Sequence, residues 1–283
     1  MTGVCDCEPT RRDLFRGAAV GAAAVIAGGA ALSATGVADA RHPATPAPGR
    51  TRLAPVAPQA ISVEALSPVT VMPGLSIRPR DMWGVDLPPK ATPARETTKF
   101  LLVHHTASPN GYDDARAVIR SAYAFQTGPA KGWIDVCYGF FIGRDGDVWE
   151  GRAGALTRPV MADATGGNQG WAQLVCLLGD FRTTTPTAAA LASLVKVLAW
   201  LAGRDLVSVN DGATATFVSR GSNRWPAGSV VTVPTIAGHR DVTATACPGD
   251  ALYSLLPDIR RRTRDQALAW RSVLRPAVRL GPP

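Results

Sequence analysis

Apolar and polar positions alternate in blocks along the chain, and the blocks predict strands and helices in a mixed order. Two apolar runs predict strands, over residues 99–108 and 172–181. The second run is nearly continuous, which is typical of a strand at the centre of a sheet. Two other stretches place apolar residues at i, i+3, i+4 and i+7, the spacing of an amphipathic helix; they span residues 113–126 and 187–202. The longer helix should be the main one packed on the sheet.

Two further segments predict β-hairpins. Residues 133–151 contain two apolar runs joined at Asp145-Gly146, a dipeptide typical of tight hairpin turns. Residues 214–218 and 229–233 flank a turn rich in Gly, Ser and Asn, and the second hairpin leads the chain to Gly238. Residues 250–262 predict a closing helix, kinked or restarted at Pro257 because proline lacks the backbone donor that a helix interior needs.

These elements together predict an α/β fold. We expect a single domain over residues 76–264, built as a mixed central β-sheet with helices packed against it, followed by a C-terminal tail at residues 265–283. Residues 41–75 are rich in Pro, Ala and Val and have no sustained period, which indicates a linker ahead of the domain.

The first 40 residues have the pattern of an export signal. Arg11 and Arg12 precede a weakly apolar run at residues 17–37, which ends in the small residues of a cleavage site at Ala38-Asp39-Ala40. A twin arginine ahead of so mild a run favours the twin-arginine route and a secreted, extracellular or wall-associated protein. The alternative is an uncleaved membrane anchor, since the run is nearly long enough to span a bilayer. No later segment predicts a span, so no stable membrane span is expected after signal removal.

Charge narrows the choice of partners. Removing residues 1–40 takes away three basic and four acidic residues, so the net charge rises from +8 to +9. A basic exported protein is attracted to polyanions, and a bacterial wall is one. Nucleic acid is not predicted, because the basic residues are scattered and the dense run at residues 260–264 is better explained as the solvated end of a helix. Nothing in the pattern specifies an oligomeric state.

Three cysteines remain after the signal, at Cys137, Cys176 and Cys247. An odd number allows at most one disulfide within the chain, so at least one thiol has another use. Cys137 and Cys176 are either bridged or two buried thiols. Cys247 follows His239 by eight residues in a segment, 238–250, that has neither helical nor strand periodicity. Such a loop can bring both side chains to one point.

Imidazole nitrogen and thiolate sulfur are the donors that zinc prefers. His104 and His105 end the first apolar run, and because strand side chains alternate, only one of them can face a given site. One of this pair with His239 and Cys247 makes three ligands and leaves a fourth position open for water, which is typical of catalytic rather than structural zinc. The alternative is a scatter of core histidines and structural cysteines.

Three strings carry a family resemblance: Val103-His-His-Thr-Ala-Ser108, residues 133–152 with Trp133-Ile-Asp-Val-Cys-Tyr138 and Trp149-Glu-Gly-Arg152, and Gly238-His-Arg-Asp241 through Cys247-Pro-Gly-Asp250. In this order they resemble the zinc amidases shared by peptidoglycan recognition proteins and phage-lysozyme-type amidases. The similarity also takes in residues 80–84 and runs to about residue 262. It implies an N-acetylmuramoyl-L-alanine amidase with Zn²⁺ in a surface groove, which cleaves the amide between N-acetylmuramic acid and L-alanine in peptidoglycan, a muramyl peptide.

The resemblance also implies roles for single residues. It assigns zinc binding to His104, His239 and Cys247, and catalysis to Tyr138 and Thr245, whose hydroxyls can orient water or donate to a tetrahedral oxyanion. It assigns substrate binding to His105, Trp133 and Asn168.

Some of these residues also have simpler interpretations. Tyr138 is an ordinary aromatic residue at a strand start, and Thr245 a loop hydroxyl bonded to its own backbone. His105 either faces the core or holds a ligand's orientation, and the second of these roles is also open to Asp241.

The sequence departs from the family pattern beside these positions. Cys137 and Gly139 flank Tyr138 where members carry a small residue and Asn or His, and Asp163 stands where histidine is usual. The resemblance places this region in the substrate groove, so the grip on the muramyl group or stem peptide is altered while the metal site is intact. Two functions follow: an exported zinc amidase, or a peptidoglycan-binding module with little or no turnover. Cys247 favours the enzyme, because losing its thiolate would disable the zinc site while a groove could still bind.

Overall fold

The computed structural model describes residues 66–165 and 170–274. The N-terminal half contains β1 (Val69–Met72), β2 (Leu75–Ile77), α2 (Asp81–Gly84), β3 (Phe100–His105), α3 (Ala115–Thr127), β4 (Phe140–Ile142), β5 (Val148–Glu150) and β6 (Ala172–Leu177). The C-terminal half contains α4 (Ala188–Arg204), β7 (Thr214–Val218), β8 (Val230–Pro234), β9 (Ile236–Gly238), the 3₁₀ turn η2 (His239–Asp241), α5 (Asp250–Ser254) and α6 (Leu256–Leu274).

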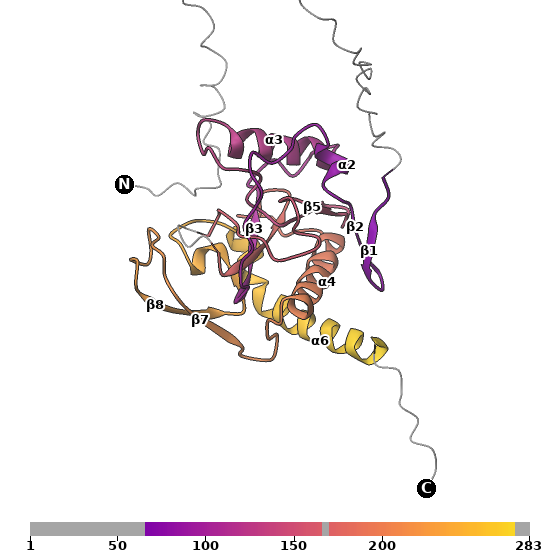
Figure 1. The fold of residues 1–283 in the computed structure, drawn as a ribbon. Helices are drawn as coiled ribbons and strands as arrows, with labels where there is room; N and C mark the ends of the chain where they lie inside the picture. The colour runs from indigo at the N-terminus through magenta and orange to yellow at the C-terminus, as the bar shows by residue number, and fades with distance from the viewer. Residues whose placement is uncertain (1–65, 166–169, 275–283) are drawn as a thin grey trace, which may run out of the picture. The chain divides into compact units, whose positions relative to one another are not determined.

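A five-stranded sheet in the order β5-β4-β6-β3-β9 forms the centre of the fold (Figure 1). β6 lies in the middle and pairs in parallel with β3 and β4, and β3 pairs in parallel with β9. β5 runs antiparallel to β4. The sheet is therefore mixed and has helices packed against it, which confirms the predicted fold class. β1 with β2 and β7 with β8 form two separate two-stranded sheets.

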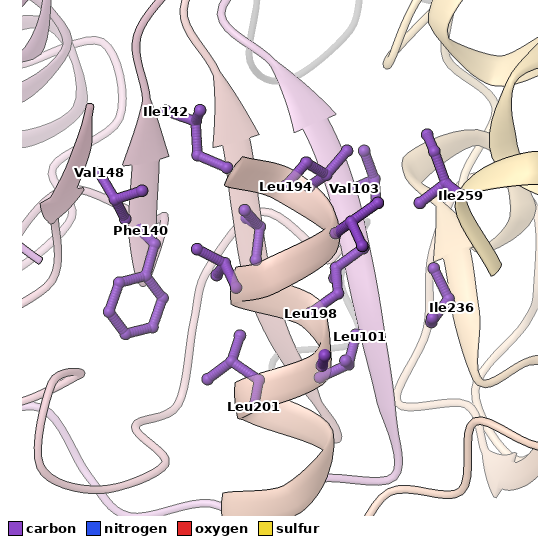
Figure 2. Close-up of a cluster of buried hydrophobic side chains, with 14 of the residues drawn as sticks. Leu101, Val103, Phe140, Ile142, Val148, Leu194, Leu198, Leu201, Ile236 and Ile259 are labelled. Carbon is purple, nitrogen blue, oxygen red and sulfur yellow. The ribbon is translucent and has the colours of Figure 1, made fainter. Parts of the chain in front are cut away.

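Each face of the central sheet has its own core, because successive side chains of a strand point to opposite faces. On one face, Leu101 and Val103 of β3 pack against α4. Figure 2 shows Leu194 and Leu198 of α4 directed at the sheet. On the other face, Leu102 belongs to a second cluster that includes residues of α3 and of the β7–β8 hairpin. β3 is thus buried on both faces.

Replacing Leu198 should test how far the α4 face stabilises the domain. Leu198 is 0% exposed, so Leu198→Ala should leave a cavity and lower the free energy of unfolding by about 2–5 kcal/mol. Denaturant titration followed by circular dichroism measures the change. Leu268→Ala on α6 is the matched control, since Leu268 is 53% exposed and its loss should change stability by less than about 0.5 kcal/mol. Equal effects of the two substitutions would contradict this account of the core.

Most predicted elements are confirmed, including both buried strands, both amphipathic helices and both hairpins. The first hairpin is shorter than expected, since β4 begins at Phe140 and residues 133–139 form an irregular loop. Side chains hold this loop in place of a strand ladder: Gln126 Oε1 accepts from Cys137 N at 2.9 Å, and Asp135 Oδ1 accepts from Val136 N at 2.8 Å. Backbone donors that are satisfied in this way have no need of a neighbouring strand.

The folded part extends past the predicted limits at both ends. β1 and the first residue of β2 lie within the segment expected to be linker, and α6 continues to Leu274. Trp270 anchors this last stretch, because it is buried and its Nε1 donates to Pro73 O at 3.2 Å. The expected restart of the closing helix occurs between α5 and α6, with Pro257 in the first turn of α6. The export signal at residues 1–40 and the tail beyond Leu274 lie outside the described residues.

The basic run on α6 forms ion pairs with nearby aspartates. Arg261 and Arg262 pair with Asp258, and Arg264 pairs with Asp265 and Asp211. Arg260 donates from Nε to Ile236 O at 2.8 Å, and burial lowers its pKa from the ordinary value. Among the residues that the structure describes, no helix is long and apolar enough to cross a membrane.

Candidate metal centre

Two of the candidate ligands follow from the sheet itself. β3 and β9 are parallel neighbours with Val103 opposite Gly238, so the next residue of each strand, His104 and His239, emerges at the same edge. The two imidazole rings lie with centroids 4.3 Å apart. Gly238 lets the end of β9 pack closely against α5, because a Cβ at this position would lie 2.8 Å from the Tyr253 ring, closer than carbon atoms can pack.

Cys247 joins the two histidines from the loop that follows η2. Its Sγ lies 3.6 Å from His104 Nδ1, and the three donor atoms of His104, His239 and Cys247 lie within 4.8 Å of one another. All three residues are 0% exposed. The structure therefore brings together the three residues that the sequence analysis selected as metal ligands.

The loop is braced from within by Arg240. Its backbone N donates to Cys247 O at 3.1 Å, and its guanidinium donates to Ala246 O at 2.5 Å and to Asp250 at 2.6 Å. Gly249 closes the loop with a φ of +90°, and a Cβ there would meet the backbone of Phe181 at 2.3 Å. This close packing against Phe181 fixes where the chain leaves the cluster.

These donors fit a zinc ion on two counts. Tetrahedral bonds of about 2.0–2.1 Å to nitrogen and about 2.3 Å to sulfur place two ligand atoms about 3.6 Å apart, which is the separation of His104 Nδ1 and Cys247 Sγ. His239 is fully buried, yet neither of its ring nitrogens has a hydrogen-bond partner among the described residues. Buried polar atoms are rarely left unsatisfied, so a metal bond to one nitrogen accounts for part of this deficit.

His105 lies on the opposite face of β3 from His104. It is 1% exposed, its ring is 6.3 Å from the Phe181 ring, and its Nδ1 accepts from Phe181 N at 3.1 Å. Asp180 Oδ1 lies 3.9 Å from the same nitrogen. Because an Nδ1 that accepts a hydrogen bond carries no proton, this contact is not an ion pair. Hydrogen bonds from Arg182 hold the pKa of Asp180 below its ordinary value. His105 thus occupies the core position that the sequence analysis left open as an alternative.

Tyr138 lies beside the candidate ligands, at the end of the irregular loop before β4. Its ring centroid is 5.1 Å from that of His104, it meets Phe141 edge-on at 5.3 Å, and it is 1% exposed. Its carbonyl accepts from Arg152 N at 2.8 Å. The aromatic ring is therefore held rigidly against one ligand.

Thr245 and Trp133 are both partly exposed. The Oγ1 of Thr245 accepts from Cys247 N at 3.1 Å, which is the local backbone bond considered from sequence alone, and its own proton stays available for donation. Trp133 lies in the loop before Tyr138, with Lys131 Nζ 5.6 Å from its ring. Asn168 lies outside the described residues.

The positions at which the sequence departs from the family pattern have structural partners. Asp163 receives a 2.6 Å ion pair from Arg152, a residue that is 3% exposed. Gly139 lies against β6, where a Cβ would be 3.3 Å from Leu174 O, so a larger residue would require a small shift of the strand. No disulfide joins any two of Cys137, Cys176 and Cys247. Cys137 and Cys176 are therefore two buried thiols, the second of the alternatives considered from sequence.

Asp241 does not orient a ligand histidine. Its carboxylate accepts from Gly238 N at 2.9 Å and from the Tyr253 hydroxyl at 2.6 Å, and this hydrogen bond raises the pKa of Tyr253. The tip of the β7–β8 hairpin contacts the 239–247 loop, among others through Asn223, and these contacts were not predicted. The polar Ser-Asn-Arg turn was visible in the sequence, but nothing there indicates which segment it touches.

Comparisons with known proteins agree with the resemblance. A family model described as N-acetylmuramoyl-L-alanine amidase matches residues 94–250, more than half of the chain. N-acetylmuramoyl-L-alanine amidase of Sus scrofa is 30% identical over 196 residues, covering 64% of this chain and 27% of that protein. Peptidoglycan recognition protein 1 of Bos taurus is 28% identical over 195 residues, covering 66% of this chain and 86% of that protein.

Solved structures of similar proteins match the same part of the chain. Human PGRP-IBETAC, in complex with glycosamyl muramyl pentapeptide, is 24% identical with a TM-score of 0.48, covering 64% of this chain and 93% of that one. Drosophila PGRP-LB is 23% identical with a TM-score of 0.47, covering 64% of this chain and 91% of that one.

Proposed function

The chain belongs to the N-acetylmuramoyl-L-alanine amidase family, and on that premise we propose that it is an exported zinc hydrolase acting on bacterial peptidoglycan. The bond cleaved is the amide between N-acetylmuramic acid and the L-alanine that begins the stem peptide. The observation that carries the proposal is the buried group of His104, His239 and Cys247, whose donor atoms lie within 4.8 Å of one another.

His104, His239 and Cys247 would hold the ion. Three protein ligands leave a fourth position for water or substrate, the arrangement of catalytic zinc sites. Zinc bound in this way lowers the pKa of water to about 7 and polarises a carbonyl group. The burial of the three donors excludes competing water and strengthens electrostatic interactions inside the site.

Tyr138 and Thr245 supply the hydroxyl groups of the proposed reaction. Tyr138 packs against His104, so its hydroxyl would orient the attacking water or donate to the oxyanion that forms on the scissile carbonyl. Thr245 is two residues from Cys247 and bonds to its backbone, so it would donate from the loop side. Trp133 and Asn168 would contact the muramyl peptide.

The proposal extends to export. The twin-arginine pattern in residues 1–40 and the net positive charge support a secreted protein that is attracted to the anionic wall. Folding before export would let the metal bind first.

Chelation is the most direct test. The purified protein incubated with a muramyl pentapeptide should release free L-alanine amino termini, which a fluorogenic amine reagent detects. Removing the metal with a chelator should stop this release, because the remaining hydroxyl donors alone lack the nucleophile, and added Zn²⁺ should restore it.

The alternative function, a binding module with little or no turnover, predicts a different result. Protein that holds zinc and binds the muramyl pentapeptide without releasing amino termini would favour it. Cys247 argues for the enzyme, because a groove could bind without it while the zinc ligand set could not form.

A further inference from the structure

The tip of the β7–β8 hairpin, residues 219–228, lies against the ligand loop, residues 239–247. Asn223 makes the densest contacts. Its Oδ1 accepts from Ala244 N at 2.8 Å and from the Thr243 hydroxyl, and its Nδ2 donates to Ala244 O at 3.1 Å. One side chain thus satisfies both backbone groups of Ala244, three residues before Cys247.

Other residues of the hairpin tip donate hydrogen bonds to the backbone carbonyls of residues 240–242 in the same loop. Ser222 Oγ donates to Val242 O at 3.1 Å, Trp225 Nε1 donates to Asp241 O at 3.4 Å, and Arg224 donates to Arg240 O. Beyond η2 the loop up to Cys247 belongs to no helix or strand. Asn223 and Ala244 are exposed, so their hydrogen bonds restrict the conformation of the loop rather than compensate for burial. The hairpin tip therefore adds a second set of hydrogen bonds to those that the loop makes within itself.

The hairpin is itself attached to the strand that carries His104. Phe217 of β7 stacks on Phe100 of β3 with ring centroids 5.1 Å apart. At the tip, the Arg220 guanidinium lies 4.4 Å from the centre of the Trp171 ring and its Nη1 donates to Glu96 at 3.3 Å. The hairpin thus links β3, which carries the candidate ligand His104, to the loop that ends in the candidate ligand Cys247.

We propose that Asn223 is a positioning residue for the metal centre. It holds the middle of the ligand loop so that Cys247 lies within reach of His104 and His239 before the ion binds. Without this side chain, the backbone groups of Ala244 lose their partners and the loop gains conformational freedom. Metal binding must then order the loop, which weakens the affinity for the ion. The inference rests on the zinc site of the proposed function but not on turnover.

Zinc affinity measured by competition with a chromophoric chelator tests the proposal. Asn223→Ala should raise the Kd for Zn²⁺ by about tenfold or more, the loss typical when the support of a metal ligand is removed. Thr243→Val removes one of the three hydrogen bonds and should raise the Kd by about threefold. Thr232→Ala is the matched control: it breaks a 2.8 Å hydroxyl pair with Thr216 on the exposed face of the same hairpin and should leave the Kd unchanged.

Thermal unfolding of the zinc-depleted proteins separates positioning from general stability. A purely structural role predicts that Asn223→Ala and Thr232→Ala lower the melting temperature alike and bind zinc as the wild type does, which would overturn the proposal. If Asn223→Ala does not fold, the Kd of Thr243→Val decides the matter. A wild-type chain that binds no zinc would overturn the proposed function together with this inference. Normal zinc binding in both loop variants would overturn the inference alone.

Discussion

Cys247→Ser is expected to remove zinc and all amidase activity together. The serine hydroxyl does not ionise near neutral pH, whereas the metal is held by a thiolate. The remaining pair, His104 and His239, would hold the ion too weakly to survive purification, so the metal content should fall from about one zinc per chain to near none. Elemental analysis of the purified variant and the amine-release assay measure the two losses.

Cys176→Ser is the matched control for this substitution. Cys176 is a second buried thiol, on the strand next to His104 and opposite it in register, but it is not part of the metal-binding group. We expect Cys176→Ser to keep its zinc and its activity and to lose about 1–3 kcal/mol of stability from burying a hydroxyl. Unchanged zinc content in Cys247→Ser would exclude Cys247 as a ligand.

Tyr138→Phe is expected to lower kcat by about 10²–10³-fold while zinc content stays at the wild-type level. Removing one donor to a developing oxyanion has an effect of this size in other hydrolases. The phenyl ring should preserve the packing against His104 and Phe141, so KM should change little. Steady-state kinetics on the muramyl pentapeptide separates the two parameters.

Tyr123→Phe provides the comparison for the loss of a tyrosine hydroxyl. Tyr123 is also buried, and its hydroxyl donates to Pro88 O at 2.7 Å. Its ring packs 6.2 Å from that of Trp83, and it is not part of the metal-binding group. We expect a stability loss of about 1 kcal/mol and an unchanged kcat. A Tyr138→Phe variant with wild-type kcat would show that Tyr138 is a structural aromatic residue.

The predictable parts of this protein are those whose patterns are local. Continuous apolar runs identified β3 and β6, and helical spacing identified α3 and α4, because burial on one or both faces leaves a direct record in residue order. The same alternation showed that only one of His104 and His105 could face the metal centre. His239 and Cys247 lie in a segment without helical or strand periodicity. That absence predicted a loop, and a loop can bring the two side chains to one metal ion.

Other features of the fold are not indicated by any local sequence pattern. β9 is only three residues long, Ile236–Gly238, too short for alternation to be recognised, yet its parallel pairing with β3 places His239 beside His104. Residues 133–139, which include Tyr138, were predicted as part of a strand but form an irregular loop. The side chains of Asp135 and Gln126 accept hydrogen bonds from the backbone of Val136 and Cys137, in place of a neighbouring strand.

The sequence by itself determined the fold class and the buried strand that carries His104 and His105, since apolar patterning carries that information directly. Residue spacing suggested the donor types of the candidate metal centre, and the family resemblance selected His104. Only the tertiary structure decided how near Cys247 lies to His104, that His105 lies on the opposite face of β3, and which side chains hold the loop. These depend on strand register and on hydrogen bonds between segments far apart in the chain, such as Asn223 with Ala244 and Val103 with Gly238. Such pairings minimise unsatisfied backbone groups over the whole fold, and no short window of sequence records them.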